Sequence, residues 1–72
     1  MEDTVAKSKY DVEVVDMYGD TVVESELVDT LEEAEQLYNV LTPLGNTTMY
    51  LRELQYNSNG TYIKTVYIKN KK

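Results

Sequence analysis

Apolar and polar residues alternate from residue 9 to residue 17, near the start of the chain. Tyr10, Val12 and Val14 are separated by acidic residues, which is the period of two of a strand with one buried face. Residues 1–8 show no sustained period. The sequence therefore predicts a flexible N-terminus followed by a strand.

A turn and a second strand follow this segment. The pair Gly19-Asp20 is typical of a two-residue hairpin turn, and residues 21–28 are rich in β-branched side chains that favour strands. Counting back from this turn places Glu13 opposite Glu26 and makes one face of the hairpin apolar. The predicted core face carries Tyr10, Val12, Val14, Val23 and Leu27.

The next segment has the signature of a capped amphipathic helix. Thr30 is a favoured N-cap residue, and Glu33 three positions later completes a capping box. Pro43 and Gly45 are expected to end the helix. Its predicted apolar stripe consists of Leu31, Ala34, Leu37, Tyr38 and Leu41.

A second hairpin is predicted around residues 57–60, whose sequence Asn-Ser-Asn-Gly is a strong turn signal between strands over 47–56 and 61–69. Both faces of this hairpin carry apolar groups, and only one of them can lie under the helix. The first face carries Tyr50, Arg52, Leu54, Tyr56, Ile63, Thr65 and Tyr67. The second face carries Met49, Leu51, Glu53, Gln55, Tyr62, Lys64, Val66 and Ile68. Residues 70–72 are expected to form a short basic tail.

These elements predict an α+β fold, with a single ββαββ domain over residues 9–69. It consists of a four-stranded antiparallel sheet with one helix packed on one face. A right-handed crossover through the helix places the third strand beside the first, which gives the strand order 2-1-3-4. A chain of 72 residues builds only a small core, so burial against a second copy is a further hypothesis.

The composition excludes several kinds of chemistry. The chain has no Cys and no His, which removes disulfides, zinc thiolates, cysteine nucleophiles and imidazole bases. The three glycines are isolated and form no phosphate-binding loop. No apolar run approaches the ~20 residues of a membrane span. We therefore expect a cytoplasmic protein without enzymatic activity, cofactor, metal or membrane partner.

Charge divides the chain into two halves. Residues 1–40 hold 12 acids and 2 bases, residues 41–72 hold 1 acid and 5 bases, and the net charge is −6. The first hairpin carries a candidate acidic face made of Asp11, Glu13, Glu24 and Glu26. This face either binds a basic protein, for instance by imitating the phosphates of nucleic acid, or is a solvated surface that keeps the protein soluble. The net negative charge disfavours binding of nucleic acid itself.

The second hairpin supplies the other candidate surface. Four of the seven tyrosines fall on it, and tyrosine gives contact area at low entropic cost. The sheet face left free by the helix is expected to bind a partner or a second copy. Its candidate residues are Tyr50, Arg52, Tyr56 and Tyr67. The alternative is that a small sheet leaves apolar groups exposed without any function.

The layout of the chain resembles that of small uncharacterised proteins encoded by bacteriophages and mobile elements. The resemblance covers residues 9–69 and is carried by the segments YDVEVVDMYGDTVVE, DTLEEAEQLYNVL and LRELQYNSNGTYIKTVYI. It implies a protein that acts in the host cytoplasm. Such a protein binds and blocks a host protein, such as a defence nuclease or a DNA-handling enzyme.

These observations favour a small acidic protein-binding module that inhibits a host protein through its acidic face, its tyrosine-bearing face, or both. One alternative is a binder of a nucleotide-like ligand at a homodimer interface. Tyrosines would stack on that ligand, and Arg52 and Lys64 would meet its charge. Another alternative is a structural protein that assembles with copies of itself.

Overall fold

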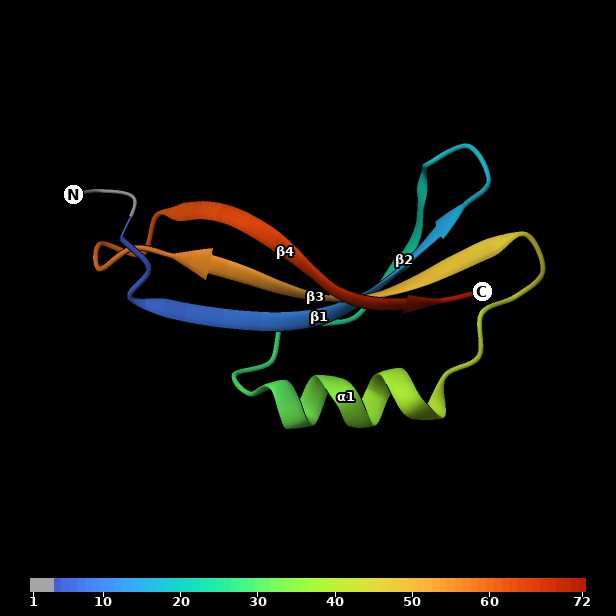
Figure 1. Cartoon of the computed structure of the whole chain (residues 1–72), viewed down its shortest axis with the longest axis horizontal. Coiled ribbons are helices and arrows are strands. Elements are labelled where there is room, and N and C mark those ends of the chain that lie inside the picture. The colour runs from blue at the N-terminus through green and yellow to red at the C-terminus, as the bar shows by residue number, and fades with distance from the viewer. Residues whose placement is uncertain (1–3) are drawn as a thin grey trace.

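The fold is a four-stranded antiparallel sheet with one helix packed on one face (Figure 1). The computed structural model describes residues 4–72. Its elements are β1 (Lys7–Asp16), β2 (Thr21–Glu24), α1 (Leu31–Val40), β3 (Thr47–Tyr56) and β4 (Tyr62–Lys71). The strand order is β2-β1-β3-β4. Both the predicted α+β class and the predicted strand order are confirmed.

The sheet extends further toward both chain ends than the sequence predicts. β1 begins at Lys7, inside the segment expected to be flexible. The Ser8 hydroxyl donates a hydrogen bond of 2.6 Å to the Glu53 carboxylate on β3, which fixes this end of the strand. β4 runs to Lys71, so most of the predicted basic tail is strand. The start of the predicted flexible segment, residues 1–3, lies outside the described residues.

Both hairpins close with the same five-residue turn. In each turn the first residue, Asp16 or Asn57, accepts hydrogen bonds of 2.9 and 3.0 Å on its side-chain Oδ1 from the amides two and four positions ahead. The fourth residues, Gly19 and Gly60, have φ values of 86° and 83°, which favour glycine. The prediction of a two-residue turn at Gly19-Asp20 is therefore wrong, because the carboxylate of Asp16 organises a longer one.

The longer turn changes the register of the first hairpin. Glu13 lies opposite Glu24 and Val14 lies opposite Val23, with a bulge beyond Val14. The predicted pairing of Glu13 with Glu26 is wrong by two residues. The bulge places one additional residue on β2. Because of it, Thr21 and Glu24 both lie on the same face of the sheet as their partners Val15 and Glu13.

β2 is shorter than the strand predicted over residues 21–28. It ends at Glu24, because the next residue turns its side chain into the sheet ladder. The Ser25 hydroxyl oxygen accepts a hydrogen bond of 2.9 Å from the Val12 amide. It also donates a bond of 3.1 Å to the carbonyl oxygen of Glu26. The side chain of Ser25 thus competes with regular strand pairing at this point.

The segment that leads into α1 is tied back to β1. Val28 and Tyr10 exchange backbone hydrogen bonds of 2.8 and 2.9 Å as an isolated bridge. The Lys9 ammonium forms an exposed ion pair with Asp29 and lowers the pKa of that carboxyl, mainly through their hydrogen bond. This pair therefore stabilises the fold above the usual carboxyl pKa, and its contribution is lost in acid.

The predicted N-cap of α1 is confirmed. The Thr30 hydroxyl oxygen accepts a hydrogen bond of 3.2 Å from the Glu33 amide, and the hydroxyl donates one of 3.0 Å to the Glu33 carboxylate. The helix ends at Val40, three residues before Pro43. Leu41 is consequently a C-cap residue and is partly exposed, so its predicted place in the buried stripe is wrong.

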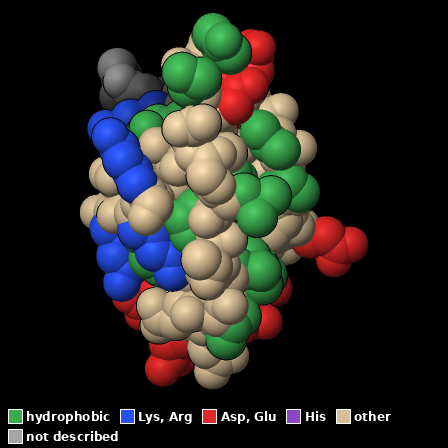
Figure 2. All heavy atoms as spheres, turned by 90° about the vertical axis from the view of Figure 1, so that its right-hand side faces the viewer, with side chains coloured by type: hydrophobic (Ala, Val, Ile, Leu, Met, Phe, Trp, Pro, Cys, Tyr) green, Lys and Arg blue, Asp and Glu red, His purple; other side chains and the backbone are tan. Residues whose placement is uncertain are grey.

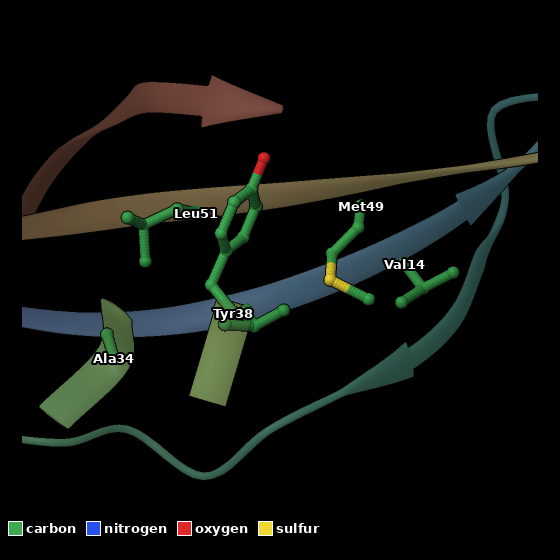
Figure 3. Packing of buried hydrophobic residues seen from close by; sticks show 6 residues of the cluster. Val14, Ala34, Tyr38, Met49 and Leu51 are labelled. Atoms are coloured by element: carbon green, nitrogen blue, oxygen red, sulfur yellow. The ribbon is translucent and has the colours of Figure 1, made fainter. Parts of the chain in front are cut away.

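The core lies between α1 and the two central strands, β1 and β3 (Figure 3). Its buried residues are Val12, Val14, Ala34, Tyr38, Met49 and Leu51. Val23 and Leu27 were predicted to join this core, but about half of each residue is exposed. The helix packs on β1 and β3 rather than on β2, and this leaves the apolar groups beyond the central strands uncovered.

Candidate functional site

The two candidate surfaces predicted from the sequence form one surface. Asp11 lies opposite Arg52, and Glu13 lies opposite Tyr50, on the face of the sheet that is turned away from α1. In Figure 1 the helix lies below the sheet, and no helix among residues 4–72 covers the upper side. We call this upper side the open face.

One arginine gathers three carboxylates at the centre of the open face. Arg52 bonds Asp11 in a bidentate way, with Nε donating to Oδ1 at 2.8 Å and Nη2 donating to Oδ2 at 2.6 Å. Its Nη1 lies 3.2 Å from Glu13 Oε1, and its Nη2 lies 3.1 Å from Glu24 Oε2. The Thr21 hydroxyl donates to the second oxygen of Glu13 at 2.6 Å. We call Arg52 and its three carboxylates the arginine network.

Most of the arginine network is buried. The side chains of Asp11, Glu13 and Arg52 are 4%, 9% and 11% exposed, whereas that of Glu24 is 53% exposed. The interpretation of the acidic residues as a solvated outer face is therefore wrong for Asp11 and Glu13. Hydrogen bonding to Asp11 raises the pKa of Arg52, together with the charges of Asp11 and Glu13 and a bond to the Tyr67 hydroxyl. With one cation and three anions, the network carries a net negative charge.

Glu26 does not belong to this network. It lies beyond the end of β2, where Ser25 interrupts the strand, and its side chain is exposed. The predicted acidic face thus divides into three residues that the structure brings together and one that it does not. The difference follows from the two-residue error in the predicted register.

Two pairs of tyrosines lie on the open face. Tyr50 and Tyr67 meet edge to face with ring centroids 5.1 Å apart, beside the arginine network. Tyr56 and Tyr62 form a similar pair at 6.1 Å, further along β3 and β4. Tyr62 was predicted on the opposite face, but a bulge at the start of β4 brings it opposite Tyr56. Three tyrosines were predicted for this surface. Tyr50 and Tyr67 form the pair beside the network, and Tyr56 is one member of the second pair.

A hollow lies between the first tyrosine pair and the turn of the first hairpin. It has a volume of about 300 Å³ and is lined by Glu13, Val15, Gly19, Tyr50 and Tyr67. Sequence reasoning missed Val15 and Gly19, because their position depends on the longer turn. The contact between Arg52 and the acidic residues had a signal in the sequence, since the predicted strand order places β1 beside β3.

The lysines of β4 lie on the other side of the sheet. Lys64 lies opposite Gln55, on the helix-facing side of β3, whereas Arg52 points to the open face. Lys69 and Lys71 place their ammonium groups 5.2 and 4.5 Å from the centre of the Tyr38 ring. Arg52 and Lys64 were predicted to meet the charge of a nucleotide-like ligand, and the structure does not bring these two residues together.

An apolar groove opens at the end of the molecule where β2 and the segment after α1 approach each other. Its volume is about 210 Å³, and it is lined mainly by hydrophobic side chains: Val14, Val22, Val23, Leu41, Thr42, Pro43, Leu44, Thr47 and Met49. Figure 2 shows hydrophobic side chains gathered over this end of the molecule, with basic side chains along one flank. The groove exists because α1 is too short to cover the whole sheet.

No family model matches the chain, and no curated protein or solved structure is significantly similar to it. None of the helical segments among residues 4–72 has both the length and the hydropathy of a membrane span. Over the same residues, no group of three or more acidic side chains is arranged to hold a metal ion.

Proposed function

We propose that the protein is a non-enzymatic binding module that recognises a basic protein with the open face of its sheet. The arginine network is the observation that carries this proposal. Three carboxylates around a single arginine leave a negative potential on a face that also exposes tyrosine rings. Such a combination favours positively charged protein surfaces, because complementary charge steers association and tyrosine supplies contact area.

The open face of the sheet is a better binding surface than the edge formed by β4. β4 forms one edge and carries Lys64, Lys69 and Lys71 together with two bulges. Lysines and bulges on an edge strand hinder pairing with a strand of another chain. A partner is therefore expected to contact side chains of the open face rather than to pair with β4.

The partner is proposed to be a host protein that the module inhibits, on the strength of the resemblance to small phage proteins. Imitation of nucleic acid is a weaker version of this proposal. A phosphate mimic needs a row of exposed carboxylates, whereas Asp11 and Glu13 are buried against Arg52. Recognition of the partner through a negative potential and a tyrosine-lined hollow fits the burial better.

The proposal predicts that Glu24→Lys weakens partner binding at least tenfold while the fold is kept, because it reverses the one largely exposed charge of the network. The measurement is affinity capture from a bacterial host lysate, read by mass spectrometry. Glu32→Lys on α1 is the matched control, with the same charge change on the opposite side of the sheet. We expect a basic protein that wild type and Glu32→Lys retain and Glu24→Lys loses. Equal capture by both variants would contradict the proposal.

A second candidate function is self-association through the apolar groove, which exposes Val22, Val23 and Leu44 to solvent. Exposed apolar patches of this kind often mark protein contacts. It predicts a dimer in light scattering at high protein concentration, and Leu44→Glu is expected to return it to a monomer. A monomer at every concentration tested removes this candidate and leaves the first one standing.

A further inference from the structure

The hollow on the open face has walls of two different kinds. Tyr50 and Tyr67 form an aromatic corner, since their rings meet at 78°. Glu13 contributes a carboxylate that is almost removed from water. Val15 and Gly19 close the remaining sides, and Gly19 belongs to the turn of the hairpin that rises above the sheet in Figure 1.

The electrostatics of the hollow favour a cation. Arg52 is occupied by Asp11, Glu13 and Glu24, whose three negative charges exceed its single positive charge. A carboxylate can accept about four hydrogen bonds, so Glu13 retains acceptor capacity after bonding Arg52 and Thr21. Aromatic faces attract cations through their quadrupole, and they do so more strongly when the cation is partly desolvated.

The size of the hollow is sufficient for a single side chain. Pockets for drug-sized ligands run from about 300 to about 1,000 Å³, and this hollow of about 300 Å³ lies at the lower limit. A guanidinium fits the chemistry better than an ammonium, because it is planar, stacks on aromatic rings and bonds carboxylates with a fork of donors.

We propose that this hollow binds the guanidinium of an arginine on the partner protein. The inference rests on the proposed function, since it names the group that the open face would recognise. Arg52 holds Glu13 in place through their ion pair, and the two tyrosines receive the incoming cation. The partner's arginine would thus be an anchor at the centre of a larger contact.

The test is a titration of the protein with methylguanidinium, followed by two-dimensional NMR of the backbone amides. We expect saturable shifts at Gly19, Tyr50 and Tyr67, with a midpoint in the millimolar range. Methylurea, which has a similar shape without the charge, should bind about tenfold more weakly or not at all. Equal shifts from the two compounds, or shifts at other residues, would overturn the inference.

Two variants separate the hollow from the rest of the face. Tyr67→Ala removes one wall, and Tyr62→Ala is its matched control, because both tyrosines lie on β4 with 55% and 52% of the residue exposed. Tyr67 also interacts with Arg52, so Val15→Phe serves as a second variant that fills the hollow from another wall and keeps all four residues of the arginine network. We expect a loss of methylguanidinium binding of about tenfold in Tyr67→Ala and Val15→Phe, but not in Tyr62→Ala. Unchanged binding in Val15→Phe would contradict the inference.

The two proposals fail in different ways. If Glu24→Lys loses a basic partner but methylguanidinium does not bind at the hollow, the partner uses the face without an arginine anchor and only this inference falls. If methylguanidinium binds at the hollow while Glu24→Lys retains every captured protein, the hollow recognises the cation and the proposed function of the whole face falls.

Discussion

Replacing Arg52 with alanine is expected to unfold most of the protein at neutral pH. The substitution leaves Asp11 and Glu13 buried without their cation, since their side chains are 4% and 9% exposed. Removing one partner of a buried ion pair costs about 3–5 kcal/mol. The core of a domain of this size rarely supplies more than about 3–5 kcal/mol of stability. The loss caused by Arg52→Ala is therefore comparable with the whole free energy of unfolding.

Urea unfolding followed by circular dichroism measures this effect, and its pH dependence identifies the cause. The pKa of Arg52 is raised in the folded protein, so the stability that its charge contributes is complete below its unfolded pKa and is lost only in strongly alkaline solution. The difference between Arg52→Ala and wild type should therefore persist across the neutral range, where the guanidinium keeps its charge, and disappear only in strongly alkaline solution.

Arg52→Lys is the matched control for geometry. It keeps the positive charge but cannot form the bidentate bond to Asp11 or reach three carboxylates at once. We expect its free energy of unfolding to lie between those of wild type and Arg52→Ala, about 1–3 kcal/mol below wild type. If the free energy of unfolding of Arg52→Ala lies within about 1 kcal/mol of the wild-type value, the arginine network does not hold β1, β2 and β3 together on the open face.

The elements and their order could be predicted because each has a local signal. The alternation around Val12 specifies a strand, Thr30 and Glu33 specify the start of the helix, and the residues before Gly60 specify a turn. These signals depend on residues close in sequence. Strand order followed from the handedness of the crossover, which depends only on chain geometry.

The register of the first hairpin could not be predicted in the same way. Its turn depends on the Asp16 carboxylate, and an acidic residue there reads equally well as the last polar position of the strand. A two-residue error followed, which moved Glu24 away from Glu13 and hid the arginine network. The buried state of Asp11 could not be read from its hairpin either, because its partner Arg52 is 41 residues away on β3.

The charge division of the chain acquires a different meaning in the folded protein. The acidic half and the basic half meet inside the molecule. Arg52 pairs with three acids of the first hairpin, and Lys69 lies 3.5 Å from Glu35 on the helix. Part of this charge segregation therefore stabilises the fold, because opposite charges of the two halves pair with each other. On the open face, the negative excess of the arginine network remains available to a partner.

Replacing Tyr38 with alanine is expected to detach the helix from the sheet. Of the helix residues, only Ala34 and Tyr38 are buried. In Figure 3 the ring of Tyr38 extends from α1 toward the sheet between Leu51 and Met49. Truncation of a buried aromatic side chain to alanine costs about 3–5 kcal/mol. We therefore expect a large loss of helical signal in circular dichroism and a much lower urea midpoint.

Tyr38→Phe separates the ring from its hydroxyl. The ring fills the core and receives the ammonium groups of Lys69 and Lys71 on its face, and the helix carbonyl of Tyr38 accepts a bond of 2.7 Å from Lys71. All of these contacts are kept in Tyr38→Phe, so its free energy of unfolding should fall by less than about 1 kcal/mol relative to wild type. A phenylalanine variant as unstable as Tyr38→Ala would contradict this account, since the hydroxyl rather than the ring would then dock the helix. Because the two lysines belong to β4, the same side chain links the helix to three strands, and its loss should loosen the edge strand as well.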